Sequence, residues 1–242
     1  MSKNEIRGDF VTNEWKDFLD NLDHLSRSVR AYHGEDTSEF KWIVITLFMT
    51  LQSIFVVCLK NTDFHNVTRN ETRGKRHGYR FALRFNWDAG KVVVSHDDHL
   101  IELSTHFAKD RRLDQLTAIN RELSNPLTEA DLAKILSECW MLVDFSELYQ
   151  RVKSNRMCCY ISSKPLPSEA RYDTAIQDLI DLRNQFIHFV PKSWSITSGH
   201  IKTVIVPCLE ILRFLLVESG NVHPDDPTEA MQTTDELIAL LN

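Results

Sequence analysis

The sequence predicts an all-α protein, a helical bundle that carries one small β-hairpin as an insertion. Three patterns support this class. Apolar side chains recur at steps of three and four residues along most of the chain, which is the spacing of one face of an α-helix. Residues 42–59 form an almost unbroken apolar run, as expected for a helix at the centre of a bundle. Only residues 62–95 show the alternation of β-strands.

The predicted helices follow one another along the chain. Asn13 precedes Trp15, Phe18, Leu22 and Val29, which share one face and predict a helix over residues 13–33. The same reasoning predicts further helices over residues 37–61, 97–111, 113–124, 128–153, 169–189, 199–219 and 228–241. Pro207 lies inside the penultimate helix, so we expect a kink there or two shorter helices.

The apolar run at residues 42–59 is about the minimum length that crosses a bilayer. Gln52 and Ser53 lie in its middle, and Thr46 and Thr50 add two hydroxyl groups. A helix buried on all sides in a bundle has the same composition. We therefore predict a core helix and no membrane partner. A membrane-anchored helical protein is the alternative.

The hairpin is predicted between residues 62 and 95. Aromatic and apolar residues alternate with Arg80 and Arg84, residues 86–90 supply a turn, and residues 91–95 are rich in valine. Residues 60–91 carry a net charge of +5, which leaves -11 on the rest of the chain. We predict a single helical domain over residues 1–242, with this basic insertion at 62–95 and a C-terminal extension helix within 220–242.

Composition excludes several classes of protein. The five cysteines are odd in number and have no C-x-x-C spacing, which is typical of a reducing compartment. We expect Cys158 and Cys159 to be small buried apolar residues. The first residues do not resemble a signal peptide, so we predict a cytoplasmic protein. A net charge of -6 is unlike a uniformly basic nucleic-acid coat. The motifs of common ATPases, dehydrogenases and serine hydrolases are absent.

The predicted helix at 169–189 has three stripes. One is a core face of Ala175, Leu179, Leu182, Phe186 and Phe189, and nearly opposite lies a polar stripe of Gln177, Asp181, Asn184 and His188. Between them, three isoleucines surround Arg183: Ile176, Ile180 and Ile187. A solvated face does not carry this pattern, so we expect the third stripe to pack on something too, such as a second copy of the same helix.

Arg183 and Asn184, followed by His188 near the end of a helix and then by an aromatic residue and a proline, resemble the R-x4-6-H motif of the HEPN superfamily. The resemblance implies an all-α homodimer in which the two motifs line a shared cleft. It also implies a metal-independent endoribonuclease of bacterial defence or toxin–antitoxin systems, with RNA as substrate and an antitoxin or regulatory protein as a further partner. We expect neither a metal nor a cofactor.

The residue types suit this chemistry. A histidine such as His188 can take or give a proton near neutral pH, and an arginine such as Arg183 can hold two phosphate oxygens and stabilise their charge. Asn184 could orient His188 or touch the phosphate. In the hairpin, Arg80 and Arg84, with Arg76 and Lys75, are predicted to bind the RNA backbone. The alternative there is a solvated edge strand protected by charge.

Two other interpretations of the motif stay open. Arg183 pairs with Asp181 or another acid, and His188 is a surface histidine, in a purely structural helix. Alternatively, the chain is a non-catalytic helical binding module for a nucleotide or a protein partner, or one that neutralises a toxin.

Overall fold

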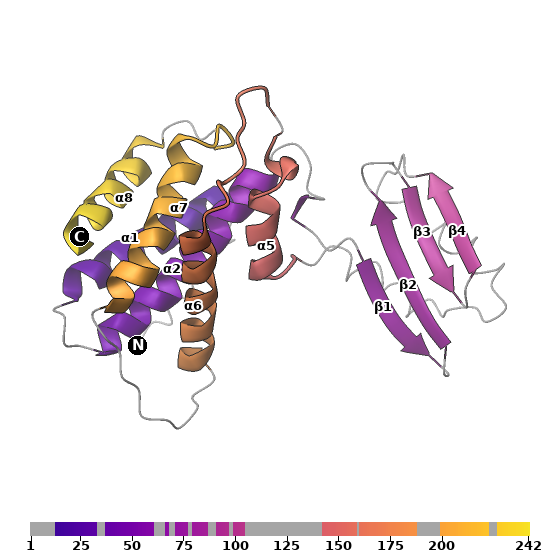
Figure 1. Cartoon of the computed structure of the whole chain (residues 1–242), viewed down its shortest axis with the longest axis horizontal. Helices are drawn as coiled ribbons and strands as arrows, with labels where there is room; N and C mark the ends of the chain where they lie inside the picture. The colour runs from indigo at the N-terminus through magenta and orange to yellow at the C-terminus, as the bar shows by residue number, and fades with distance from the viewer. Residues whose placement is uncertain are drawn as a thin grey trace, which may run out of the picture. The chain divides into compact units, whose positions relative to one another are not determined.

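The computed structural model describes residues 13–32, 37–60, 66–67, 71–76, 79–86, 91–96, 99–104, 142–158, 160–187, 199–222 and 227–242. The chain divides into two compact units, one formed by Met1–Thr62 with Phe145–Asn242 and the other by Asp63–Asp144. The described residues are mostly helical, as the sequence predicts (Figure 1).

The first unit is built from helices. They are α1 (Glu14–Ala31), α2 (Thr37–Lys60), α5 (Phe145–Val152), the 3-10 helix η2 (Asn155–Met157), α6 (Ala170–Ile187), the π-helix η3 (Ile201–Ile205), α7 (Val206–Val217) and α8 (Thr228–Leu241). Asn13 caps α1, since its side-chain oxygen accepts the backbone N–H of Lys16 at 2.8 Å. The predicted first two helices and the last one are confirmed.

Helix α2 forms the core of this unit and packs against α1, α5, α6 and α7 (Figure 1). Its fully buried side chains include Phe40, Ile43, Leu47 and Leu51. The hydroxyls of Thr46 and Thr50 donate to carbonyl oxygens one turn earlier, at 2.7 and 2.8 Å. By length and composition alone α2 is long and apolar enough to cross a membrane, and 56% of its most apolar window is buried inside the unit.

Pro207 divides the penultimate helix as expected. Residues 201–205 form a π-helix, in which the N–H of Val206 donates to the carbonyl of Ile201, five residues earlier. The regular helix α7 then begins, with Pro207 at its start. Proline has no N–H and its ring clashes with the preceding turn, so the wider π turn gives the chain a continuous helical path there.

Two predicted helices differ from the structure. Of the helix expected over residues 128–153, the structure describes residues 142–153, and the helix there begins only at Phe145. Just before it, the N–H of Val143 donates to the carbonyl of Val67 at 3.0 Å, a bond that holds this segment extended. The helix expected over residues 97–111 is also wrong in part, because residues 99–104 form a strand.

The second unit contains an antiparallel sheet with the strand order β1-β2-β3-β4. The strands are β1 (Glu71–Arg76), β2 (Tyr79–Asn86), β3 (Lys91–His96) and β4 (His99–Ser104). The alternation that predicts β2 continues in register through β4, where Ile101 pairs with Val94 and Leu103 with Val92. A strand pairing outweighed the helical spacing at residues 99–104.

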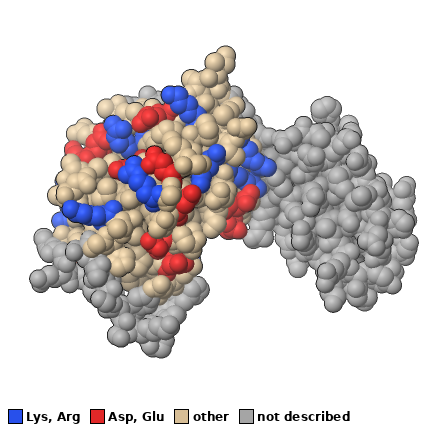
Figure 2. All heavy atoms as spheres, in the orientation of Figure 1, with Lys and Arg blue, Asp and Glu red and all other residues tan. Residues whose placement is uncertain are grey.

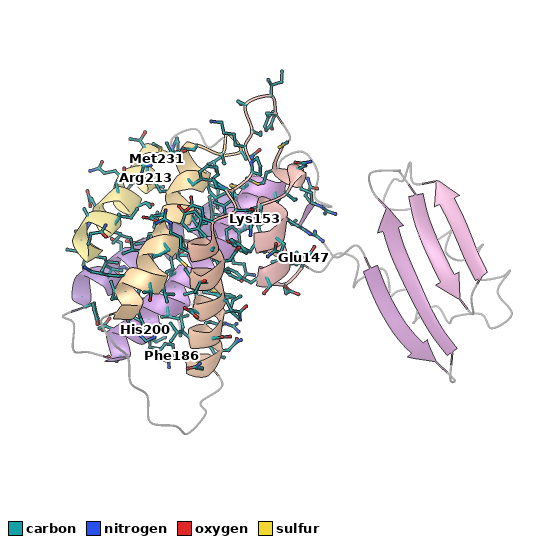
Figure 3. The ribbon with its side chains drawn as sticks, viewed as in Figure 1. Glu147, Lys153, Phe186, His200, Arg213 and Met231 are labelled. Atoms are coloured by element: carbon teal, nitrogen blue, oxygen red, sulfur yellow. The ribbon has the colours of Figure 1, made fainter. Side chains whose placement is uncertain are left out.

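A polar cluster fixes the beginning of α6 against α5. The hydroxyl of Tyr149 donates to Asp173 Oδ1 at 2.7 Å, and Lys153 Nζ reaches the same oxygen at 2.5 Å (Figure 3). The Lys153 ammonium and then the Tyr149 hydroxyl lower the pKa of Asp173. Burial, followed by the Asp173 carboxylate, raises the pKa of Tyr149. These bonds hold the first turn of α6 against the end of α5.

Buried Asn221 ties the segment before α6 to the end of α7. Its Nδ2 donates to the carbonyl of Met157 at 2.8 Å, and its Oδ1 accepts the Ser163 hydroxyl at 2.9 Å. The neighbouring Gly220 has φ +66°, and an added Cβ would lie 2.9 Å from the carbonyl oxygen of Ser162. Glycine is therefore required where the two segments approach most closely.

Replacing Asn221 with alanine should lower the free energy of unfolding by about 1–3 kcal/mol, since the partners at Met157 and Ser163 lose a buried hydrogen bond. Urea denaturation measures the change. Asn155→Ala is the matched control because Asn155 is exposed, and it should stay within about 0.5 kcal/mol of wild type. Equal loss in both variants would contradict the assigned role of Asn221.

Asp173→Asn should reduce the loss of stability that acid causes. The folded pKa of Asp173 lies below its usual 3.8, so its carboxylate stabilises the fold above that pH, and the contribution disappears as pH falls through the folded value. The variant should therefore lose less stability than wild type as the pH falls from about 5 to below 3.8, measured by urea midpoints. Asp181→Asn, on the exposed face of α6, should keep the wild-type pH dependence.

Candidate functional site

Arg183 lies one turn before the end of α6 and is half-buried. Its guanidinium carbon is 4.9 Å from the centre of the Phe48 ring on α2. Phe48 in turn stacks on Phe145 of α5, with ring centres 4.2 Å apart and planes 24° apart. A cation over an aromatic face is attracted by the partial negative charge of that face, so the buried Phe48 ring helps to hold this guanidinium in place.

Asn184 contacts Arg183 directly. Arg183 Nη1 donates to Asn184 Oδ1 at 3.0 Å, which uses one of the five guanidinium N–H groups. The sequence suggested that Asn184 would orient His188 or touch a phosphate, whereas its described bond orients the arginine. Asn184 therefore acts on the site through Arg183 in this structure.

Within the described part of the chain, no carboxylate lies within ion-pair distance of Arg183. Asp181, the acid considered as its partner, instead accepts a hydrogen bond from Gln177 Nε2 at 3.1 Å. Ionic pairs are formed by other arginines of the unit, including Arg151, Arg171 and Arg213. The positive charge of Arg183 is thus compensated by an aromatic face and an amide among the described residues, an arrangement that suits an external anion.

His188 lies outside the described residues, and so do the segments that follow it up to residue 198. Phe186, on the last turn of α6, packs edge-on against Phe40 with ring centres 6.4 Å apart (Figure 3). His200 contacts the same Phe40 ring at 6.4 Å. The fold therefore brings His200 to the C-terminal end of α6. His200 lies outside the R-x4-6-H motif, so the sequence did not indicate that it would lie near the end of α6.

The isoleucine stripe is only partly as predicted. Ile176 is 3% exposed and packs in the core of its own unit, so at this position the stripe is covered by the same chain and not by a second copy. Ile187, next to the motif, is 41% exposed, and Ile180 is half-buried. On α2, Trp42 and Met49 are exposed and lie two turns apart. Met49 directly follows Phe48, whose ring contacts the Arg183 guanidinium. Exposed large apolar residues therefore lie at the end of α6 and on α2, among others elsewhere on the unit such as Leu240 on α8.

The strand pairing groups most of the predicted RNA-binding residues. Lys75 is paired with Arg80, and Arg84 lies four residues further along β2, so the two-residue period puts all three on one face. Arg76 is paired with Tyr79 and falls on the other face, so it does not belong to this group. The same register adds Arg73, opposite Ala82, and Lys91, opposite Asn86. It also puts two acidic residues on this face, Glu71 opposite Arg84 and Glu102 opposite Val93. We call Arg73, Lys75, Arg80, Arg84 and Lys91 the basic sheet face.

The described cysteines of the helical unit differ in exposure. Cys58 and Cys208 are fully buried, and burial raises the pKa of Cys58 to about 12 and that of Cys208 as well. Cys158 is exposed, which contradicts the expectation that it is buried, and Cys159 lies outside the described residues. The described residues contain no group of three or more metal-ligating side chains placed to hold an ion.

The described geometry therefore centres on one guanidinium that the core positions and an amide orients. Such a group can hold two oxygens of a phosphate or carboxylate in a fixed plane. Compared with known family models, curated proteins and solved structures, the chain matches none of them.

Proposed function

We propose that this chain is a metal-independent endoribonuclease of the HEPN type, in which Arg183 binds the scissile phosphate and His188 transfers protons. The observation that supports it most is the placement of Arg183. Its guanidinium is anchored on Phe48 and Asn184 and has no acidic partner among the described residues. A charge held in this way is ready for an anionic ligand and needs little reorganisation when one binds.

In the proposed reaction a base removes the proton of a ribose 2′-hydroxyl, and the 2′-oxygen attacks the adjacent phosphorus. The bond to the 5′-oxygen breaks, and an acid protonates that leaving oxygen. The products are a 2′,3′-cyclic phosphate and a 5′-hydroxyl. His188 serves in proton transfer, and the Arg183 fork stabilises the extra negative charge on the phosphate oxygens in the transition state.

The proposed active form is a homodimer. Arg183 and His188 are about 140° apart on an ideal helix, so one helix does not direct both side chains at one phosphate. A second copy supplies the missing group across a shared cleft. Ile187, Trp42 and Met49 are the exposed apolar side chains that such a copy would cover. The basic sheet face, which carries five Lys or Arg, would hold the RNA backbone.

The biological setting we propose is bacterial defence or a toxin–antitoxin system in the cytoplasm, with a protein that restrains the nuclease. The alternative function is a non-catalytic helical binding module. Its supporting observation is the same stack of Arg183 on Phe48, since a structural arginine also covers an aromatic ring in this way. The cleavage experiment separates the two functions.

Purified protein should cleave labelled RNA in the presence of EDTA, leaving cyclic phosphate ends. His188→Ala should slow cleavage about 100-fold or more because proton transfer is lost. Arg183→Ala should slow it about 100-fold, and Arg183→Lys should fall between, since lysine keeps the charge and loses the fork. The controls are His24→Ala and Arg27→Ala on exposed positions of α1. Equal cleavage by all variants would remove Arg183 and His188 from the site.

Ile187→Glu should convert the dimer to a monomer and abolish cleavage, because a charge would be buried at the proposed contact. Light scattering coupled to size exclusion measures the mass. Leu240→Glu, a change of another exposed apolar residue at 59% exposure on α8, should leave mass and activity unchanged. A wild-type protein that cleaves RNA as a monomer would contradict the shared cleft.

A further inference from the structure

The pairing of β3 with β4 places two histidines directly opposite each other. His96 is the last residue of β3 and His99 is the first residue of β4, and they are Cα partners in the antiparallel ladder (Figure 1). Directly paired residues of an antiparallel sheet lie on the same face, with Cβ atoms about 4.5–5.5 Å apart. The register therefore brings the two histidines to one position at the β4 edge of the sheet.

The two histidines interrupt the pattern of their sheet face. The two-residue period puts them on the face opposite to the basic sheet face. That face is largely apolar and carries Phe81, Leu83, Val92, Val94, Ile101 and Leu103. Among the described strand positions, only Arg76 has a formal charge on this face, and it belongs to β1, two strands from β3. A polar pair at the end of an apolar face departs from the alternation, which points to a functional role.

The chemistry of the pair favours a cation as its ligand. Two protonated imidazoles directly opposite each other would repel, and like charges at such positions destabilise a sheet. Two neutral imidazoles instead offer two nitrogen donors, and neutral imidazole is the commonest metal ligand in proteins. The two residues between the histidines in the sequence are Asp97 and Asp98. Their negative charges favour a cation over an anion in this segment.

We propose that His96 and His99 form a two-point binding site for a divalent transition-metal ion of the Zn²⁺ class, with water in the remaining coordination positions. Imidazole nitrogens bind Zn²⁺ at about 2.0–2.1 Å, so two of them on one tetrahedral ion are about 3.3 Å apart. Histidines at directly opposite strand positions can span that separation. The ladder fixes both backbone positions before the ion arrives, which reduces the entropy cost of binding. The bound ion joins the edge strand β4 to β3.

In the helical unit, acidic side chains lie beside basic ones. On the face drawn in Figure 2, Asp and Glu are interspersed with Lys and Arg. Asp20 is paired with Lys16, for example, and Asp23 with Arg27. Carboxylates in such pairs already have a cation, and the described residues contain no larger group of metal-ligating side chains. We therefore assign the metal to the histidine pair of the sheet, which departs from the expectation that the chain takes no metal.

The test is calorimetric titration of the full chain with Zn²⁺, after treatment with EDTA and desalting. Wild type should bind Zn²⁺ at about pH 7.5, where imidazole is neutral. His96→Gln and His99→Gln should each weaken binding about 100-fold or more, because each leaves a single ligand in place of the chelate. The double variant should bind about as weakly as either single variant. His24→Gln, at an exposed position of α1, is the matched control and should bind as wild type does.

A second measurement uses the wild-type chain alone, so it does not depend on the folding of a variant. Zn²⁺ should protect His96 and His99 from modification by diethyl pyrocarbonate, read by mass spectrometry, and should leave the modification of His24 unchanged. No Zn²⁺ binding by wild type, unchanged binding by either single variant, or equal modification of the pair with and without Zn²⁺ would each overturn the proposal. Neither measurement involves RNA, so this inference stands independently of the proposed ribonuclease activity.

Discussion

Burial of α2 is the constraint on which the helical unit depends. Four other helices pack against it, and its apolar side chains supply most of the large residues that are fully buried. Each fully buried aliphatic or aromatic side chain contributes about 1.5–3 kcal/mol to folding. The threonine hydroxyls inside α2 bond to its own backbone, so they add little desolvation cost. The remaining helices take their places relative to this one.

The candidate site is an edge of that core. Phe48 belongs to α2 and is buried, and its ring contacts both the Arg183 guanidinium and the ring of Phe145. Phe48 therefore contributes both to the packing of the core and to the candidate site. The bonds of Asp173 hold the first turn of α6 against α5, and the bonds of Asn221 hold the segment before α6 against the end of α7. We expect a substitution at either end of α6 to shift the position of the Arg183 guanidinium.

The sequence by itself determined the helical class, the central position of residues 37–60, the irregularity at Pro207 and the alternation in the strands. These depend on periodicity and on proline's missing N–H, which are local properties. It did not determine that residues 99–104 pair as a strand, that Ile176 is buried, that Cys158 is exposed, or that Phe48 lies beneath Arg183. Those outcomes depend on contacts between residues far apart in the chain. Only the tertiary structure decides them, because the spacing of residues along the chain indicates which face of an element is apolar but not which other element covers that face.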